Sequence, residues 1–187
     1  MTESHLCDLH VDPTVTVRSL GEKIPRIAST TWVSEAAYVV GDVELGENCS
    51  VWPGAVVRGD FAPIRVGRNT VIEDNCVLHT GQPMTIGDDI IIGHAAVVHC
   101  ARVGSSCLIG NQATLLDGAT VGDYCLVASG ALLLGGVAVP DRSFVVGAPA
   151  RVEPLSADHL RRLESQGRLN AEQGYGMMVQ RYKEAGL

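Results

Sequence analysis

The sequence repeats with a period of six residues through most of its length, and this period constrains the fold more than any other feature. Aliphatic residues recur from Val40 to Val145, mostly in steps of six, and eight of them are followed directly by glycine. The fifth position of each unit is usually alanine or cysteine. Six is the spacing of one short strand plus one corner. Three such units close a triangular turn of roughly 18 residues, and such turns stack as a parallel β-helix.

The repeat divides the chain into three parts. We expect residues 38–153 to form the β-helix and residues 1–37 to lead into its first coil. Residues 154–187 lose the repeat and predict a C-terminal α-helical segment, with Ser156 as a plausible N-cap. The composition agrees with an all-β solenoid, because the chain has 24 Val and 21 Gly but only eight aromatic residues. Valine favours strands and glycine favours corners.

Charge and cysteine usage exclude several classes of protein. The formal net charge of −7 argues against a nucleic-acid partner and against an anionic membrane surface. The longest apolar stretch, residues 126–139, contains three glycines and is too short to span a bilayer. Residues 1–11 have no signal-peptide pattern, and the six cysteines form no CxxC pair. We therefore expect free thiols and a cytoplasmic location, with four of the cysteines as small core residues.

Three histidines are placed by the register of the repeat. His79 and His99 each follow the aliphatic residue of their unit, and three units separate them. They therefore share one column in adjacent coils, about 4.8 Å apart, where two outward imidazoles can share a metal ion. His94 lies on the preceding face, on the order of 10 Å or more away around a corner. We expect it to complete the site from a neighbouring copy of the chain.

This arrangement predicts a closed homotrimer with three identical metal sites, one at each interface. Three neutral imidazoles with one open position are the ligand set of a catalytic zinc centre. Such a centre lowers the pKa of bound water to about 7.

Other polar residues share these columns. Arg58 lies one coil below His79, and Asp60 is two residues further along the chain. Asp74 lies one coil below His94, and Asn111 lies one coil above it. We expect these residues to form pairs at the interface and to orient the metal ligands.

Several segments together give a specific resemblance. Residues 51–60 read VWPGAVVRGD, residues 73–79 read EDNCVLH, and residues 93–99 read GHAAVVH. These segments resemble the γ-class carbonic anhydrases and their hexapeptide-repeat relatives. The similarity runs from about residue 24 to the C-terminus.

The resemblance implies a left-handed β-helix, a homotrimer and the reversible hydration of carbon dioxide to bicarbonate by a metal-bound hydroxide. It implies that His79 and His99 bind the metal from one chain and His94 from the neighbour. The metal is expected to be Zn²⁺, with Fe²⁺ or Co²⁺ as possible occupants. Glu73 stands where the best-studied active form has Gln beside the bound water, and Tyr175 resembles a tyrosine that approaches the site in relatives with short loops.

Two other functions stay open at this point. A hexapeptide acyltransferase also forms trimers but uses a single histidine as general base, without a second histidine above it. A metal-binding trimeric scaffold would bind zinc with little or no hydratase activity. The sequence also leaves open whether Cys100, next to His99, contacts the metal.

Overall fold

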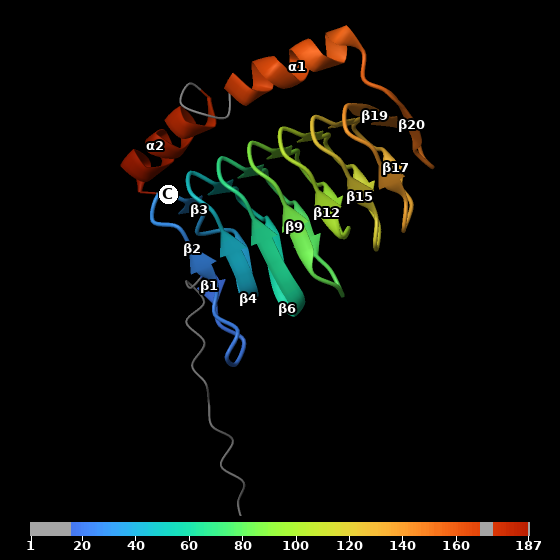
Figure 1. The fold of residues 1–187 in the computed structure, drawn as a ribbon. Helices are drawn as coiled ribbons and strands as arrows, with labels where there is room; N and C mark the ends of the chain where they lie inside the picture. Colours follow the sequence, from blue (N-terminus) through green and yellow to red (C-terminus); the bar gives the residue numbers. More distant parts are fainter. Residues whose placement is uncertain (1–15, 169–173, 187) are drawn as a thin grey trace, which may run out of the picture.

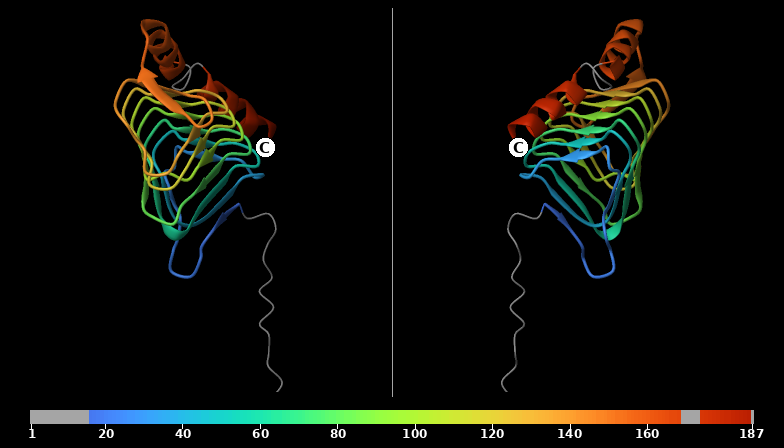
Figure 2. Two further views of the ribbon diagram at one scale, coloured as in Figure 1. Left: turned by 90° about the vertical axis from the view of Figure 1, so that its right-hand side faces the viewer. Right: turned by 90° about the vertical axis from the view of Figure 1, so that its left-hand side faces the viewer.

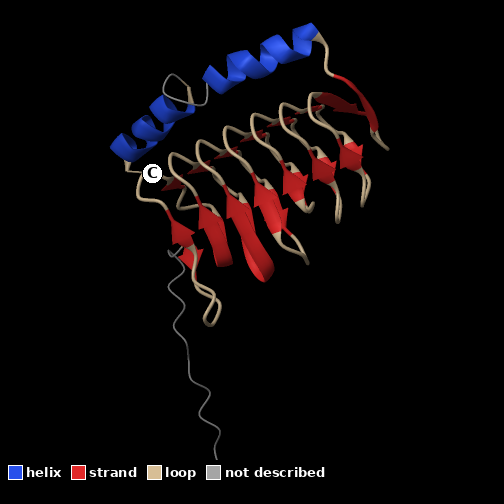
Figure 3. Ribbon diagram, viewed as in Figure 1, coloured by secondary structure: helices blue, strands red, loops and turns tan. Residues whose placement is uncertain are grey.

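The computed structural model describes residues 16–168 and 174–186 of the chain. This part winds into a left-handed parallel β-helix of about 7 turns, which two α-helices follow (Figure 1). End-on views show the triangular cross-section that the six-residue period predicts, with the helices outside the triangle (Figure 2). Short strands and corners alternate along the whole solenoid (Figure 3). The fold class predicted from the repeat is confirmed.

Most strands contain only two residues, because each side of the triangle is short. In chain order the elements are β1 (Val17–Arg18), β2 (Arg26–Ile27), β3 (Trp32–Val33), β4 (Tyr38–Leu45), β5 (Ser50–Val51), β6 (Val56–Val66), β7 (Val71–Ile72), β8 (Val77–His79), β9 (Met84–Ile86), β10 (Ile91–Ile92), β11 (Val97–Val98), β12 (Arg102–Val103), β13 (Leu108–Ile109), β14 (Thr114–Leu115), β15 (Thr120–Val121), β16 (Leu126–Val127), β17 (Leu132–Leu133), β18 (Ala138–Val139), β19 (Ser143–Val146), β20 (Arg151–Pro154), α1 (Ala157–Arg168) and α2 (Tyr175–Ala185).

The strands form three faces, and each face is a ladder of strands from successive turns. The first face stacks β8, β11, β14 and β17 on the first half of β6. The second face stacks β9, β12, β15 and β18 on the second half of β6. The third face runs from β3 through β5, β7, β10, β13 and β16 to β19, where the antiparallel β20 ends the ladder. Equivalent residues of successive turns therefore lie about one strand spacing apart.

The core lies inside the triangle and follows the repeat. The inward aliphatic residues Ile72, Leu78, Ile92 and Val98 are fully buried. At the first unit the predicted inward residue, Val40, is wrong by one position. Val39 pairs with the inward Val57 and belongs to the core, whereas Val40 pairs with Arg58. Two adjacent valines are ambiguous in sequence, and the pairing of β4 with β6 decides between them.

Parallel pairing begins before residue 38, the expected start of the β-helix. β1 and β2 pair with β4, and β3 pairs with β5. Ile27 lies opposite Leu45 and Val33 opposite Val51, so the first coil uses the same aliphatic positions. The rest of the expected lead-in, residues 1–15, lies outside the described residues.

The two C-terminal helices agree with the predicted helical segment. The Ser156 hydroxyl accepts the His159 backbone N–H at 3.2 Å, as an N-cap does. Helix α2 lies over the third face, where its residues pack against Trp32, Trp52 and Val71. In the described ranges, no helix is long and apolar enough to cross a membrane.

Five of the six cysteines lie in the described residues, and all five are free and buried. Cys49, Cys76, Cys107 and Cys125 occupy the small inward position, as predicted, and belong to the core. Cys7 lies outside the described residues.

Candidate metal centre

Two histidines lie one above the other at the end of the first face. His79 is the last residue of β8, and His99 directly follows β11. The residues before them, Leu78 and Val98, are partners in the parallel ladder. The ring centroids of the two histidines are 5.2 Å apart, and their side chains are 15% and 27% exposed. The register therefore places two accessible imidazoles close enough to share one ion.

An ion pair below His79 orients its ring. Arg58 is the ladder partner of His79, and its guanidinium donates to Asp60 Oδ2. The other oxygen of Asp60 lies 3.0 Å from His79 Nε2. Partial burial raises the pKa of the Asp60 carboxyl, but hydrogen bonds from Arg58 and the Phe61 backbone N–H outweigh this and hold that pKa below its usual range. Asp60 is therefore a charged partner for the imidazole.

His99 has a carboxylate neighbour of its own, which sequence reasoning missed. Its Nδ1 lies 3.0 Å from Asp117 Oδ1 but is buried without a hydrogen-bond partner in the described part of the chain. A buried ring nitrogen in this state needs a polar or metal partner to satisfy it. Leu115 is the ladder partner of Val98, and Asp117 follows Leu115 by two residues, so the register places Asp117 in the coil next to His99. This register was the available signal.

His94 lies at the other end of the first face, in the corner between β10 and β11. Its column is the predicted one: the Ala95 N–H donates to the Asp74 carbonyl, the Gln112 N–H to the His94 carbonyl, and the Gly130 N–H to the Asn111 carbonyl. The His94 ring is 53% exposed and lies between two carboxylates. Its Nδ1 is 3.1 Å from Asp74, and its Nε2 is 3.3 Å from Glu73.

Glu73 connects His94 to the C-terminal helix. The Glu73 side chain is only 9% exposed, and its Oε2 accepts the His94 backbone N–H at 3.1 Å. The Tyr175 hydroxyl donates to the other oxygen, Oε1. Burial and the bond to Glu73 raise the pKa of the Tyr175 phenol above its usual value. The tyrosine is therefore a neutral donor that fixes the carboxylate beside His94.

An aromatic cluster holds Tyr175 in this position. The Tyr175 ring lies edge-on to Trp52, with 5.9 Å between the ring centroids. Tyr182, further along α2, has its ring centroid 5.3 Å from that of the same tryptophan. Sequence reasoning missed this cluster. The two tryptophans on the third face were its only signal, since outward apolar residues need cover.

The single chain does not bring the three histidines together. Among the described residues, no group of three potential ligands is close enough to hold a metal ion. His79 and His99 meet, whereas His94 is separated from them by the width of the first face. The donor chemistry fits a zinc-type ion, because two partly exposed imidazoles converge, a carboxylate lies beside each ring, and Asp60 orients the His79 ring. A closed site requires a ligand from outside this chain.

Cys100 does not belong to this site. Its side chain is fully buried in the core, and its thiol donates to the Arg102 carbonyl at 3.7 Å. Burial raises the pKa of the thiol to about 12.

No family model matches the chain, but the curated proteins described next are similar to it and are all named as carbonic anhydrases. It is 41% identical over 155 residues to a carbonic anhydrase of Geobacillus kaustophilus, covering 81% of this chain and 85% of the relative. It is 49% identical over 128 residues to a probable carbonic anhydrase of Methanocaldococcus jannaschii, covering 67% and 80%. A mitochondrial γ carbonic anhydrase of Arabidopsis thaliana is 37% identical over 123 residues, or 62% of this chain. The chain spans only 44% of that plant protein.

Solved structures confirm the fold and carry other names. A Bacillus cereus protein named as a candidate acetyltransferase aligns with a TM-score of 0.82 and 31% identity, over 90% of this chain and 97% of its own. A hexapeptide transferase family protein from Anaplasma phagocytophilum aligns with a TM-score of 0.72 and 32% identity, over 80% and 92%.

Proposed function

The chain belongs to the γ-class carbonic anhydrase family, and from this premise we propose that it catalyses the reversible hydration of carbon dioxide to bicarbonate. The observation that carries the proposal is the stacking of His79 on His99, with ring centroids 5.2 Å apart and a carboxylate beside each ring. An acyltransferase that uses one histidine as a base does not need the second.

In this proposal the protein is a homotrimer, and each metal ion is shared by two chains. His79 and His99 of one chain and His94 of the partner subunit would hold it. Zinc is the expected ion, with iron(II) or cobalt(II) as alternatives. When bound, such an ion polarises a water molecule, lowers the pKa of that water to about 7 and so provides a nucleophile at neutral pH.

The remaining residues orient ligands and handle the proton. Asp60, with its partner Arg58, orients the His79 ring. Asp74 and Asn111, in the coils below and above His94, support the corner that carries His94. We assign Glu73 Oε2 to hold the proton released during hydration, because it is the carboxylate oxygen 3.3 Å from His94 Nε2. Tyr175 fixes the other oxygen of Glu73 by donating a hydrogen bond to it.

The second candidate function is acyl transfer. It is supported by the names and the TM-scores of 0.82 and 0.72 of the two structural neighbours, both above 30% identity. Chelation separates the two candidates, since removing the metal abolishes hydration and leaves acyl transfer to an amine unchanged.

The test is stopped-flow hydration of carbon dioxide by protein purified without oxygen and reloaded with zinc or iron(II). We expect activity that His94→Ala abolishes, together with loss of metal. His159→Ala is the matched control, because His159 lies in α1 and contacts Phe144, away from the centre. Full metal occupancy without hydration would reject the carbonic anhydrase proposal and favour the scaffold.

A further inference from the structure

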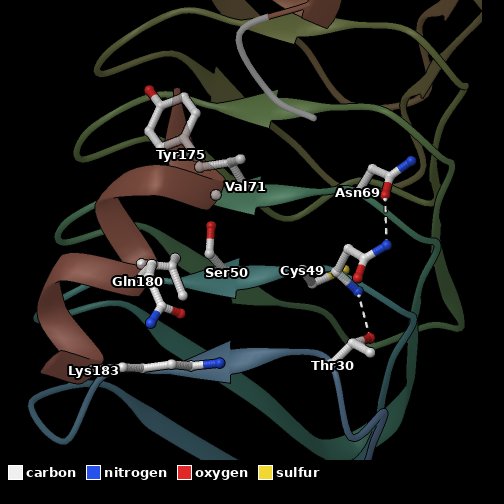
Figure 4. Close-up of a pocket in the computed structure, with 11 residues that line it drawn as sticks. Thr30, Cys49, Ser50, Asn69, Val71, Tyr175, Gln180 and Lys183 are labelled. Carbon is white, nitrogen blue, oxygen red and sulfur yellow. Dashed lines mark hydrogen bonds between the residues drawn. The ribbon is translucent and has the colours of Figure 1, made fainter. Parts of the chain in front are cut away.

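A cavity of about 430 Å³ lies between α2 and the third face, apart from the three histidines (Figure 4). This volume is in the range of small-molecule sites. Its floor is formed by the buried residues Cys49, Ser50 and Val71, and α2 forms one wall. The opposite wall is the corner that carries Asn48 and Asn69.

The charge of the cavity has one sign. Among the described residues that line it, Lys183 is the one charged residue and none is a carboxylate. Within the described ranges, the salt bridges leave Lys183 without an acidic partner. The nearby Glu184 carboxylate accepts the Gln180 amide at 2.9 Å. Figure 4 shows the Lys183 side chain extending from α2 toward the strand side of the cavity.

Two hydroxyl groups add hydrogen-bond donors. Thr30 Oγ1 accepts the Asn48 backbone N–H at 2.9 Å, and Ser50 Oγ accepts the Trp52 indole N–H at 3.0 Å. Each hydroxyl uses a lone pair in these bonds and keeps its own proton to donate. Ser50 is only 4% exposed, so its proton needs a partner inside the cavity.

The strand-side wall is rigid. Asn48 and Asn69 lie in the left-handed region, with φ of 56° and 54°, at equivalent positions of adjacent corners. The Asn48 amide donates to Asn69 at 3.3 Å, and the Asn69 amide donates to Asp89 at 2.9 Å. This ladder fixes the side of the cavity that faces Lys183, so the cavity is formed before a ligand arrives.

We propose that this cavity binds a small monocarboxylate with an apolar body. The carboxylate group pairs with Lys183 and accepts the Thr30 hydroxyl, while the body lies against Val71, Val179 and the Tyr175 ring. One ammonium with one hydroxyl donor beside it matches a single carboxylate. The inference goes beyond the proposed hydration reaction and does not depend on it.

The experiment is a ligand-observed NMR titration of the full chain with benzoate, and with benzamide as its neutral analogue. We expect benzoate to bind with a Kd of roughly 1 mM or tighter, and benzamide at least about tenfold more weakly. Lys183→Met should weaken benzoate binding about tenfold, whereas Lys183→Arg should retain it. Val179→Phe fills the cavity and should abolish binding with the charge intact.

Metal-free and zinc-loaded protein are both titrated, because a carboxylate can also bind a metal ion. Binding that requires zinc and ignores Lys183→Met would place benzoate at the histidines and overturn the inference. Equal binding of benzamide, or no benzoate binding to the metal-free protein, would overturn it as well. Thermal unfolding of each variant verifies that the fold is retained.

Discussion

At the scale of single residues, Glu73 is where the solenoid and the C-terminal helix meet. Its two oxygens accept hydrogen bonds from groups that lie far apart in sequence, the Tyr175 hydroxyl and the His94 backbone N–H. A carboxylate this deeply buried is costly unless both oxygens are satisfied. The coils above Glu73 are also closely packed. Gly93 lies one coil above Glu73, and a Cβ at Gly93 would lie 2.3 Å from Asn111 Oδ1.

Replacing Tyr175 with Phe tests this link. Tyr175→Phe leaves the aromatic packing in place but removes one hydrogen bond to the buried carboxylate. We expect the free energy of unfolding to fall by about 1–3 kcal/mol. We also expect the hydration kcat/KM to fall about tenfold, because the residue holding the proton is no longer fixed. Urea unfolding and stopped-flow hydration measure the two effects.

Tyr182→Phe is the matched control. Tyr182 packs on Trp32 and on Trp52, the tryptophan that Tyr175 also contacts, and the Tyr182 hydroxyl makes no hydrogen bond within the described residues. Tyr182→Phe should leave the free energy of unfolding and the hydration kcat/KM nearly unchanged. Equal losses in the two variants would mean that Tyr175 acts only through packing.

At the scale of elements, the site depends on the close parallel pairing of β4 and β6. These two strands are the longest in the described part of the chain because they continue around a corner at which other strands end. Gly41 and Gly59 are partners in this ladder, and a Cβ on Gly59 would lie 2.5 Å from the Asp42 carbonyl oxygen. Gly59 separates Arg58 from Asp60, so the same close approach aims the ion pair at His79.

We expect Gly59→Ala to push the two strands apart. Backbone atoms cannot yield as a side-chain tip can, so the free energy of unfolding should fall by roughly 2 kcal/mol. Zinc affinity should fall with it, because Asp60 moves away from His79. Urea unfolding and zinc titration measure the two quantities. Gly81→Ala serves as the control, since a Cβ at Gly81 meets nothing within 4 Å. A Gly59 variant with unchanged zinc affinity would show that the close pairing of β4 and β6 does not position Asp60.

The corner thiols are a second property of the elements. Cys49 and Cys76 donate to carbonyl oxygens of the next coil, Gly67 and Gly93 respectively. Burial raises the pKa of the Cys49 thiol to about 11 and that of Cys76 to about 12. The folded protein therefore keeps both thiols protonated where the unfolded chain has lost the protons.

This difference predicts an alkaline loss of stability. A folded pKa above the unfolded value gives stability that is complete below the unfolded pKa, near 8.5, and that is lost as pH rises toward 11–12. Within that window the free energy of unfolding should fall by about 1.4 kcal/mol per pH unit for each thiol. Urea unfolding at several pH values measures the slope. Cys76→Ala should reduce the slope at little cost, since Ala55 and Ala96 occupy the same position in adjacent coils. A slope unchanged in Cys76→Ala would contradict the assignment.

At the scale of the whole molecule, the six-residue period was enough to predict the solenoid, and its register was enough to stack His79 on His99. The same register placed Arg58, Asp74 and Asn111 in their columns. It could not choose between Val39 and Val40, because either valine fits the pattern until β4 pairs with β6. It could not predict that α2 docks on Trp52, or the cavity beside it, because those contacts join segments that share no period.

His94 reaches the other two histidines only if two chains meet at the site. In one chain it lies across the first face from them, beside Glu73 and Asp74. If each centre joins two chains, His79→Ala and His94→Ala damage opposite halves of the site. Neither variant should bind zinc when it is assembled without the other. In mixed trimers, an interface with an intact half from each variant is whole again.

Random mixing of equal amounts of the two variants gives a definite expectation. One interface in about four combines the intact His79 and His99 of one variant with the intact His94 of the other. Co-refolded protein should therefore regain about a quarter of the wild-type zinc content and hydration activity, whereas unmixed samples regain none. His79→Ala mixed with His99→Ala is the control, because both changes damage the same half and no interface is restored. Zinc recovered in neither mixture would mean that the three histidines do not form a site between chains.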